Sequence, residues 1–172
     1  MDVTTYRNGD AIPQVTDPTA WANLTTGAWC YYNNDAANGP IYGKLYNWYA
    51  VNDVRGLAPT GYHVPSDGEW TTLETCLGGN TIAGGAMKEI GTTHWLSPNT
   101  GATNSSGFAG LPGGSRDGNG TFYNIGSFGY WRSSTENLTA YAWLRSLYYY
   151  YSDVVRSYNA KSNGFSVRCL RD

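Results

Sequence analysis

The middle of the chain, residues 91–140, constrains the fold more than any other segment because it is so rich in turn-forming residues. Glycine, serine and asparagine recur throughout it, as in the run THWLSPNTGATNSSGFAGLPGGSRDGNG. Such residues favour turns and loops over regular helix or strand. A long irregular tract is stable only when apolar side chains anchor it to a core. We therefore expect loops here, held by four buried aromatic anchors: Trp95, Phe108, Phe122 and Trp131.

Two helices are predicted ahead of this tract. In the first, over residues 41–53, four residues recur at the i, i+3, i+4, i+7 spacing of an amphipathic helix: Tyr42, Leu45, Tyr46 and Tyr49. At the start of the second, Ser66 and Glu69 stand at the spacing of a capping box. The apolar residues that follow form one stripe, consisting of Trp70, Leu73 and Leu77. Gly78 then supplies a left-handed end to this helix.

The C-terminal segment alternates like two β-strands joined by a turn over residues 151–153. We expect Trp143 and Leu147, with Val154 after the turn, to face the core. The other face of the first strand is mixed in character, and we expect it to point outward: Leu144, Ser146, Tyr148 and Tyr150. Two helices, long Gly/Asn/Ser-rich loops, a small antiparallel sheet and a closing β-hairpin predict a single α+β domain over residues 1–172.

Composition excludes several classes of function. Charged residues make up 14% and aromatic residues 15% of the chain, with 22 glycines, which is typical of a loop-rich globular domain. The net charge of −2 argues against nucleic-acid binding, because phosphate recognition needs clustered cations. No apolar run has the length of a membrane span, so we expect no membrane insertion. No secretion signal is visible at the N-terminus, and we expect an excised domain.

No set of residues has the spacing of an active site or a metal centre, so we expect no catalytic residue, metal or cofactor. His63 and His94 have no cysteine or carboxylate at ligand spacing, and we interpret both as packing residues. Asp67 and Glu69 are interpreted as helix-capping carboxylates. The cysteines are odd in number and far apart, which favours free buried thiols over a disulfide. They are Cys30, Cys76 and Cys169.

Five motifs, taken in order, resemble those of one known family. They are YGKLYNWYAV, GLAPTGYHVPSDGEW, SGFAGLPGGSRDGNGTF, GYWRSST and GFSVRC. Together they resemble the Fibrobacter succinogenes major paralogous domain family over roughly residues 6–172. That family is similar to the C-type lectin fold, in the branch related to formylglycine-generating enzymes, and its members are mostly bacterial surface or secreted proteins. The resemblance implies a C-type lectin-like fold and an extracellular or cell-surface location.

This chain lacks sequence motifs that related proteins use for sugar binding or for catalysis. The calcium motif of sugar-binding C-type lectins is absent, and the cysteine pair of the formylglycine-generating enzymes has no counterpart here. Many family members also carry a cysteine where this chain has Ala58. Function resides in such sites rather than in the fold. The resemblance therefore implies neither an enzymatic activity nor calcium-dependent sugar binding, and we expect a non-enzymatic domain that binds a protein or a cell-surface ligand.

The closing hairpin also resembles the variable proteins of diversity-generating retroelements, in which a reverse transcriptase rewrites adenines in the C-terminal coding segment. Adenine changes alone convert an Asn codon to Tyr, Ser, Asp, Leu, Val or Ala, the residues found here. Paratopes use Tyr for contact area and Ser for adaptable hydrogen bonds. We expect a hypervariable ligand-binding surface at about residues 141–163. Its predicted residues are Tyr141, Leu144, Ser146, Tyr148, Tyr150, Tyr151, Asp153, Val155, Ser157, Tyr158, Asn159 and Ala160.

Three other interpretations stay open. The tyrosines can be packing residues of an aromatic-rich core. The domain can be an undiversified structural or adhesive module of a bacterial surface or a phage particle, in which case replacing Tyr148 and Tyr150 with alanine changes assembly or stability and not affinity. An enzyme of the formylglycine-generating type is the third interpretation.

Overall fold

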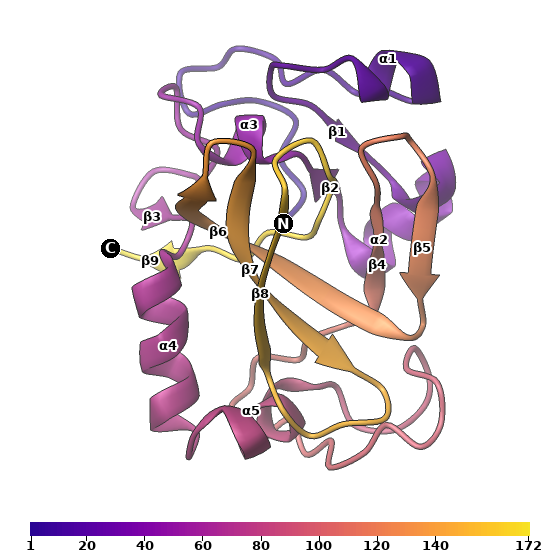
Figure 1. The fold of residues 1–172 in the computed structure, drawn as a ribbon, viewed down its shortest axis with the longest axis vertical. Helices are drawn as coiled ribbons and strands as arrows, with labels where there is room; N and C mark the ends of the chain where they lie inside the picture. The colour runs from indigo at the N-terminus through magenta and orange to yellow at the C-terminus, as the bar shows by residue number, and fades with distance from the viewer.

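The computed structural model describes residues 1–172, and at its centre lies a three-stranded antiparallel sheet (Figure 1). Its strands are β6 (Phe128–Leu138), β7 (Tyr141–Tyr148) and β8 (Val155–Ala160), in the order β6-β7-β8. β7 is the middle strand, and β8 is an edge strand. The β-hairpin predicted at the end of the chain is confirmed, and β6 extends it to a sheet.

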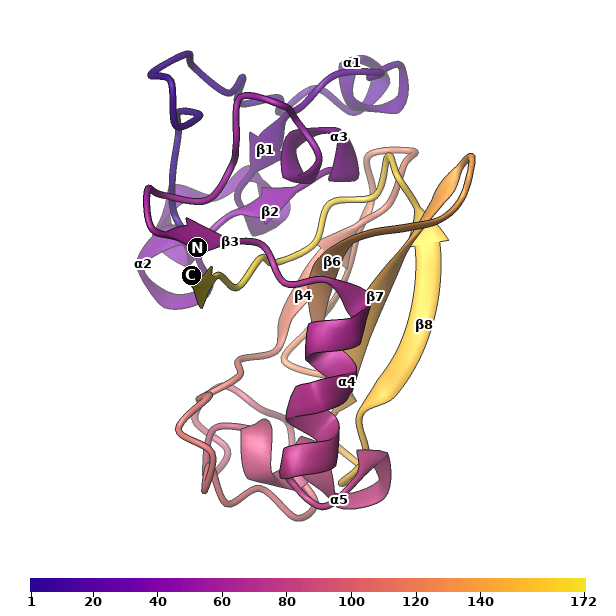
Figure 2. The same cartoon turned by 90° about the vertical axis from the view of Figure 1, so that its left-hand side faces the viewer.

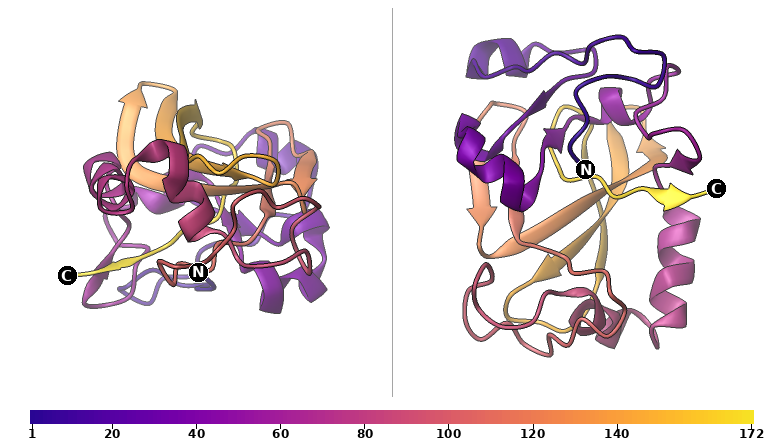
Figure 3. Two further views of the ribbon diagram at one scale, coloured as in Figure 1. Left: turned by 90° about the horizontal axis from the view of Figure 1, so that it is seen from below. Right: turned by 180° about the vertical axis from the view of Figure 1, so that it is seen from behind.

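Three smaller antiparallel pairs surround this sheet. They are β1 (Trp29–Cys30) with β2 (Leu45–Tyr46), β3 (Tyr62–His63) with β9 (Leu170–Arg171), and β4 (Gly113–Arg116) with β5 (Phe122–Ile125). The β3–β9 pair joins the end of the chain to its first half. Both termini consequently lie together on the side of the molecule away from β8 (Figures 2 and 3).

The two longest helices flank the central sheet. α4 (Asp67–Cys76) runs beside the sheet, and α5 (Asn80–Met87) lies at the end where the hairpin turns (Figure 1). The other helices are α1 (Pro18–Ala22), α2 (Gly39–Tyr42), α3 (Trp48–Val51) and the 3-10 turns η1 (Tyr32–Asn34) and η2 (Ala36–Asn38). This mixture confirms the predicted α+β class. None of these helices combines the length and the apolar character that crossing a bilayer requires.

α4 begins and ends as the sequence predicts. The Glu69 N–H donates to Ser66 Oγ at 3.3 Å, and the Ser66 N–H donates to Glu69 Oε2 at 2.8 Å, which completes the capping box. Gly78 follows the helix with φ +95°, a left-handed conformation that glycine adopts at no steric cost. The predicted apolar stripe packs into the core: Trp70, Leu73 and Leu77.

The prediction of a single helix over residues 41–53 is wrong. This segment forms α2, then β2, then α3. Gly43 interrupts the helix with φ +74° and ψ −152°, and Tyr46 then exchanges backbone hydrogen bonds of 2.9 and 3.0 Å with Phe165. Asn47 caps α3 with its side chain. Pairing with a distant segment thus overrides the local helical spacing.

The loops predicted over residues 91–140 are confirmed only in their first part. Residues 91–112 contain no helix and no extended strand, whereas β4, β5 and β6 occupy most of the remainder. These strands depend on pairing partners, which a glycine-rich sequence does not reveal. The predicted anchors Trp95 and Trp131 are buried, and the other two, Phe108 and Phe122, are partly buried.

A cluster of buried side chains lies between α4, α5 and the central sheet and packs against the hairpin. It contains Trp70 and Trp95 together with Leu147 of β7 and Val154, which precedes β8. The prediction that Leu147 and Val154 face the core is confirmed. Trp143, which we expected beside them, is partly exposed, so this part of the prediction is wrong.

His63 is an ion-pairing residue and not the packing residue that we expected. Its Nδ1 lies 2.6 Å from Asp172 Oδ1, its Nε2 lies 2.8 Å from Glu69 Oε1, and its side chain is 38% exposed. It thereby links the C-terminal residue to the first turn of α4. Hydrogen bonding to Asp172, and then to Glu69, raises the pKa of His63 above its ordinary value of 6.5.

These contacts of His63 predict that stability falls as pH rises through neutrality. Because the folded-state pKa lies above the unfolded one, the contribution of His63 is complete below about pH 6.5 and is lost as pH rises through the folded-state pKa. The Tm should drop as the pH rises from about 6.5 through the folded-state pKa of His63, and His63→Gln should reduce that drop. Thermal melts followed by circular dichroism give the Tm of the wild type and of His63→Gln at each pH. An equal change of Tm with pH in the two proteins would contradict the prediction.

Candidate binding surface

Consecutive tyrosines, residues 148–151, gather with Phe128 of β6 at the end of the hairpin. The rings of Tyr148 and Tyr150 are nearly parallel, at an angle of 9°, with centroids 5.8 Å apart. Tyr151 meets Tyr150 edge-on at 4.3 Å, and Phe128 meets Tyr148 edge-on at 4.6 Å. We refer to Phe128, Tyr148, Tyr150 and Tyr151 as the aromatic cluster. Its rings contact one another closely enough to form one continuous surface.

The outer members of the aromatic cluster are open to solvent. Tyr151 is 52% exposed and Tyr150 is 39% exposed, whereas Tyr148 is half-buried. Burial raises the pKa of Tyr148 above its ordinary value of 10. The placement of Tyr150 and Tyr151 on an accessible surface therefore agrees with the sequence prediction, and Tyr148 forms its inner border.

The turn that carries the aromatic cluster is tied to α5 mainly through main-chain atoms. The Gly85 N–H donates to the Ser152 carbonyl at 2.9 Å, and the Val154 N–H donates to the Asn80 carbonyl at 2.7 Å. One side-chain bond adds to these, from the Ser152 hydroxyl to the Thr81 carbonyl at 3.2 Å. No tyrosine side chain takes part in these hydrogen bonds, although Tyr149 packs against the buried cluster that includes Ala83 and Met87 of α5.

Lys88 holds the same turn from the interior. Its side chain is fully buried, and Nζ donates to the carbonyls of Thr100 at 2.8 Å, Tyr148 at 3.0 Å and Tyr151 at 2.7 Å. Burial lowers the pKa of Lys88 to about 8, against the opposite effect of Asp153, so the amine is mostly protonated at neutral pH. These charge-assisted bonds fix the main chain at both ends of the tyrosine run whatever side chains it carries.

Close approach of glycine backbone completes the support of the turn. A Cβ atom added to Gly84 would lie 2.2 Å from the Asp153 carbonyl oxygen, and one added to Gly85 would lie 2.3 Å from the Gly101 carbonyl oxygen. Any side chain at either position would therefore displace backbone. The Gly84-Gly85 pair is needed for the turn and the loop at Gly101 to rest on α5.

Two residues that we expected to point outward are buried. Leu144 and Ser146 are each 1% exposed. They belong to the middle strand and lie opposite Arg132 and Tyr130 of β6, whose larger side chains flank them on the same face. The prediction that Leu144 and Ser146 line the binding surface is wrong, because it treated the segment that forms β6 as a loop.

The other predicted residues do not form one patch but lie on the two faces of the sheet at β8. The strand register places three of them on the face of Tyr148: Val155, Ser157 and Asn159. On the opposite face, Tyr158 meets Tyr141 edge-on at 5.7 Å and Trp143 at 5.6 Å, with Ala160 next to them in the ladder. Asp153 is half-buried in the turn. The single shared patch that we expected is therefore corrected to two surfaces joined by the edge strand.

Arg132 of β6 holds the far end of the hairpin in the way that Lys88 holds its turn. It is fully buried, and its guanidinium donates to the carbonyls of Ala142 and Asn159 at 3.1 Å each, and also to the Ala160 carbonyl. Burial lowers the pKa of Arg132. Because its partners are main-chain carbonyls, side chains on β8 can change without loss of these bonds.

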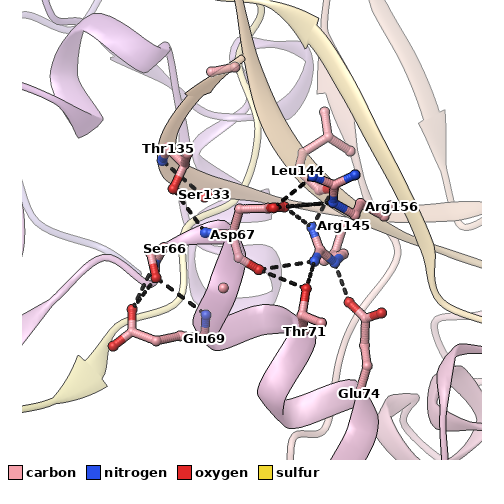
Figure 4. A network of polar contacts seen from close by, with 12 residues as sticks. Ser66, Asp67, Glu69, Thr71, Glu74, Ser133, Thr135, Leu144, Arg145 and Arg156 are labelled. Atoms are coloured by element: carbon pink, nitrogen blue, oxygen red, sulfur yellow. Dashed lines mark hydrogen bonds and ion pairs between the residues drawn. The ribbon is translucent and has the colours of Figure 1, made fainter.

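A network of charged groups attaches the opposite face of the hairpin to α4 (Figure 4). Arg145 Nη1 donates to Asp67 Oδ1 at 2.6 Å, and its Nε donates to Glu74. Arg156 lies 2.8 Å from Asp67 and stacks over Trp143 with 3.5 Å to the ring centroid. Burial alone would raise the pKa of Asp67, but hydrogen bonds from the two guanidinium groups hold it below its usual range. Asp67 is thus an ion-pair residue rather than only the helix cap that we expected.

Comparison with known proteins gives one match. Residues 1–171 match the Fibrobacter succinogenes major domain (Fib_succ_major). The chain belongs to this family. The family resemblance drawn from the five sequence motifs is thereby confirmed. No curated protein and no solved structure matches the chain, so the likeness to C-type lectin-like domains and to retroelement variable proteins stays a prediction.

Away from the hairpin, several polar groups of this Fibrobacter succinogenes major domain are paired within the fold. No three His, Cys, Asp or Glu side chains come close enough to hold a metal ion. All cysteines are free, as predicted, although only Cys30 is buried. A hollow of about 550 Å³ is lined in part by His63, Ser66 and Glu69, but the Ser66 hydroxyl donates to Glu69 Oε2 at 2.8 Å as part of the helix cap.

Sequence reasoning missed the two residues that position the surface of this Fibrobacter succinogenes major domain, Lys88 and Arg132. A signal for Lys88 was present, because it follows the small and apolar run AGGAM at the end of a helix. Small and apolar neighbours allow a lysine side chain to be buried, and a buried ammonium needs acceptors around it. Arg132 lay in a segment expected to be a loop, so nothing indicated its burial.

Proposed function

We propose that this domain is a non-enzymatic receptor-like or adhesin-like module that binds a protein or cell-surface ligand through the aromatic cluster and the adjoining residues of β8. The observation that carries this proposal is the separation of roles at the turn. Lys88 and α5 hold its main chain, whereas the side chains of Tyr150 and Tyr151 stay free. A surface built in this way can exchange side chains without loss of the fold.

The chemistry of the aromatic cluster supports recognition through contact area and hydrogen bonds rather than through charge. Tyrosine combines a large ring, able to cover ~150–250 Å², with few torsions to freeze on binding. Several such rings supply much of the ~800 Å² that each partner of a standard interface buries. Two cations of this region are engaged within the fold, Lys88 by carbonyls and Arg156 by Asp67.

We extend the proposal to diversification by a retroelement, with an undiversified structural or adhesive module as the alternative. Support at the main chain by Lys88 and Arg132 is what a repeatedly rewritten surface requires. The coding locus tests this point. We expect a near-copy of the 3′ end that differs mainly at adenines, next to a reverse transcriptase gene. A unique 3′ end without such a gene would favour the alternative.

The proposed module requires no reaction and no cofactor, and it acts outside the cell, at a cell surface or on a phage particle. The Gly84-Gly85 contact and the three carbonyl bonds of Lys88 make the turn a rigid platform. Both termini lie on the side away from β8, so chain ends leave this surface clear (Figures 2 and 3). This geometry suits a domain that presents the hairpin to a partner.

Replacing Tyr150 and Tyr151 together with serine should weaken binding strongly and spare the fold. Both side chains are exposed, and neither makes a hydrogen bond that holds the turn in place. We therefore expect the Tm to change by less than about 4 °C. Binding of the labelled domain to a panel of intact bacteria, read by flow cytometry, should fall by about tenfold or more.

The matched control for this double variant is Tyr62→Ser. Tyr62 is 41% exposed on β3, on the side of the molecule that carries the termini (Figure 2). We expect it to bind as well as the wild type. Equal loss in the control and the double variant, or no loss in either, would contradict the proposed site. Loss of assembly or of the folded state in the double variant would favour the structural module.

A further inference from the structure

We propose that the open edge of β8 docks an extended peptide segment of the partner, which adds a fourth strand to the β6-β7-β8 sheet. This inference rests on the proposed binding function and assigns its partner to a chemical class. β8 is the last strand of the sheet, and no other segment lies beside its outer edge in Figure 2. β8 contributes residues to both faces of the sheet, Ser157 to the face of Tyr148 and Tyr158 to the face of Trp143, so its edge borders both surfaces.

The hydrogen-bond pattern shows which groups of β8 face outward. The Lys161 N–H donates to the Ala140 carbonyl at 2.9 Å, directly after the paired residues Ala160 and Tyr141. In an antiparallel ladder the residues of a strand alternate between bonding the neighbour and facing away from it. The odd-numbered residues of β8 therefore bond β7. Arg156 and Tyr158 direct their N–H and C=O groups away from the sheet.

The open stretch is bounded at both ends by intramolecular hydrogen bonds. Before it, the Val154 N–H donates to the Asn80 carbonyl at 2.7 Å. After it, the Ala160 N–H is taken by Asn159 Oδ1 at 2.8 Å. Between these points lie the outward N–H and C=O groups of Arg156 and Tyr158. The residues 156 and 158 present a donor and an acceptor each, about 6.8 Å apart along the strand.

β8 lacks the features by which proteins protect an open edge. Edge strands are commonly blocked by proline, by a bulge or by a free charge. The register of β8 against β7 is continuous, and the strand sequence VRSYNA contains no proline. Its one charged side chain, Arg156, lies 2.8 Å from Asp67 and stacks on Trp143, so it is drawn back onto the sheet. The edge is left accessible.

An extended polypeptide is the ligand class that matches these groups. Only a peptide main chain offers alternating acceptors and donors at the repeat of a β-strand, whereas a sugar or a nucleic acid does not. Its side chains would alternate between the two faces of the sheet. One set would meet Tyr158 and Arg156, and the other would meet Ser157 and its neighbours. Main-chain bonds would give affinity, and the side chains of β8 would give specificity.

The test compares Tyr158→Pro with Tyr158→Ala against peptides selected from a random linear library displayed on phage. Proline at 158 removes an outward N–H and leaves the bonds to β7 in place. We expect both variants to keep the wild-type fold by circular dichroism, whereas Ser157→Pro, which removes an inward N–H, should lower the Tm strongly. Peptides selected on the wild type should bind Tyr158→Pro about tenfold or more weakly than Tyr158→Ala.

A second readout comes from the peptide. N-methylation at successive positions should weaken binding at every other residue, because only alternate amides face β8. Equal affinity for Tyr158→Pro and Tyr158→Ala, an N-methyl scan without period two, or failure to select any peptide would overturn the proposal. A dimer of the domain that Tyr158→Pro abolishes, seen by analytical ultracentrifugation, would overturn it in favour of pairing between two copies.

The experiment separates this inference from the proposed function. Selected peptides that bind the Tyr150→Ser/Tyr151→Ser variant normally but not Tyr158→Pro would support edge docking and count against the aromatic cluster. Binding that the serine variant loses, and that Tyr158→Pro keeps at the level of Tyr158→Ala, would do the reverse.

Discussion

Replacing Lys88 with methionine is expected to lower the free energy of unfolding by about 3 kcal/mol and to release the turn that carries the aromatic cluster. Each of its three acceptor carbonyls loses a charged donor, and an unsatisfied buried polar group costs about 1–3 kcal/mol. Removing a buried charge offsets part of this loss. Urea denaturation gives the stability change, and hydrogen exchange of the amides of residues 148–154 reports the release.

The matched control for Lys88→Met is Lys44→Met. Lys44 is also buried, and its Nζ donates to the carbonyl of Asp2 at 3.1 Å and pairs with the Asp2 carboxylate, far from the hairpin. We expect Lys44→Met to be destabilising as well but to leave exchange in residues 148–154 unchanged relative to the rest of the chain. If both variants accelerated exchange in the turn equally, Lys88 would have no specific role in positioning it.

Local features of this chain could be predicted from its sequence, whereas the role of Lys88 could not. The capping box of Ser66 and Glu69 was readable because capping is a local property, confined to one turn of helix. The hairpin of β7 and β8 was readable from its local sequence pattern, although the pattern did not show which of its faces is buried. The role of Lys88 depends on carbonyls that are 12, 60 and 63 residues away in the chain. No local pattern specifies such partners.

The same limit explains the errors. The spacing of Tyr42, Leu45, Tyr46 and Tyr49 is helical, but pairing of Tyr46 with Phe165 breaks the segment into short pieces. β6 was missed because its residues gain strand character only from pairing with β7. Pairing with β6 explains why Leu144 and Ser146 are buried. The alternation of β8 itself places Tyr158 and Ala160 on the face opposite to Ser157, which divides the expected patch. The identity of the tyrosine-rich turn as an accessible surface could be predicted, whereas the faces of the sheet could not.

The three supports of the hairpin have one property in common. Lys88, Arg132 and α5 bind main-chain atoms of the turn and of β8, and the side chains of Tyr150 and Tyr151 take no part in these bonds. A surface that changes its side chains needs such supports, since a side chain cannot be both variable and structural. The residues that hold the turn and β8 in place are therefore the buried cations and the glycines of α5 rather than Tyr150 and Tyr151.

Arg145→Met is expected to reduce the free energy of unfolding by about 3–5 kcal/mol, because it breaks a buried ion pair and leaves a carboxylate without its partner. Arg145 is fully buried, bonds Asp67 at 2.6 Å and Thr71 Oγ1 at 3.0 Å, and pairs with Glu74. Asp67 keeps Arg156 as a partner, whereas Glu74 has none left. The largest cost should therefore arise at Glu74, where α4 meets β7.

This reasoning is tested by a second substitution and a control. Arg145→Met/Glu74→Leu removes both buried charges, and we expect it to regain about 2 kcal/mol or more relative to Arg145→Met. Arg156→Met removes the exposed partner of Asp67 and should cost about 1 kcal/mol or less. Urea denaturation of the wild type and the three variants gives the free energies of unfolding to be compared. If Arg145→Met and Arg156→Met were equally mild, α4 would be attached to the hairpin by its apolar side chains, and the charged network would contribute little to stability.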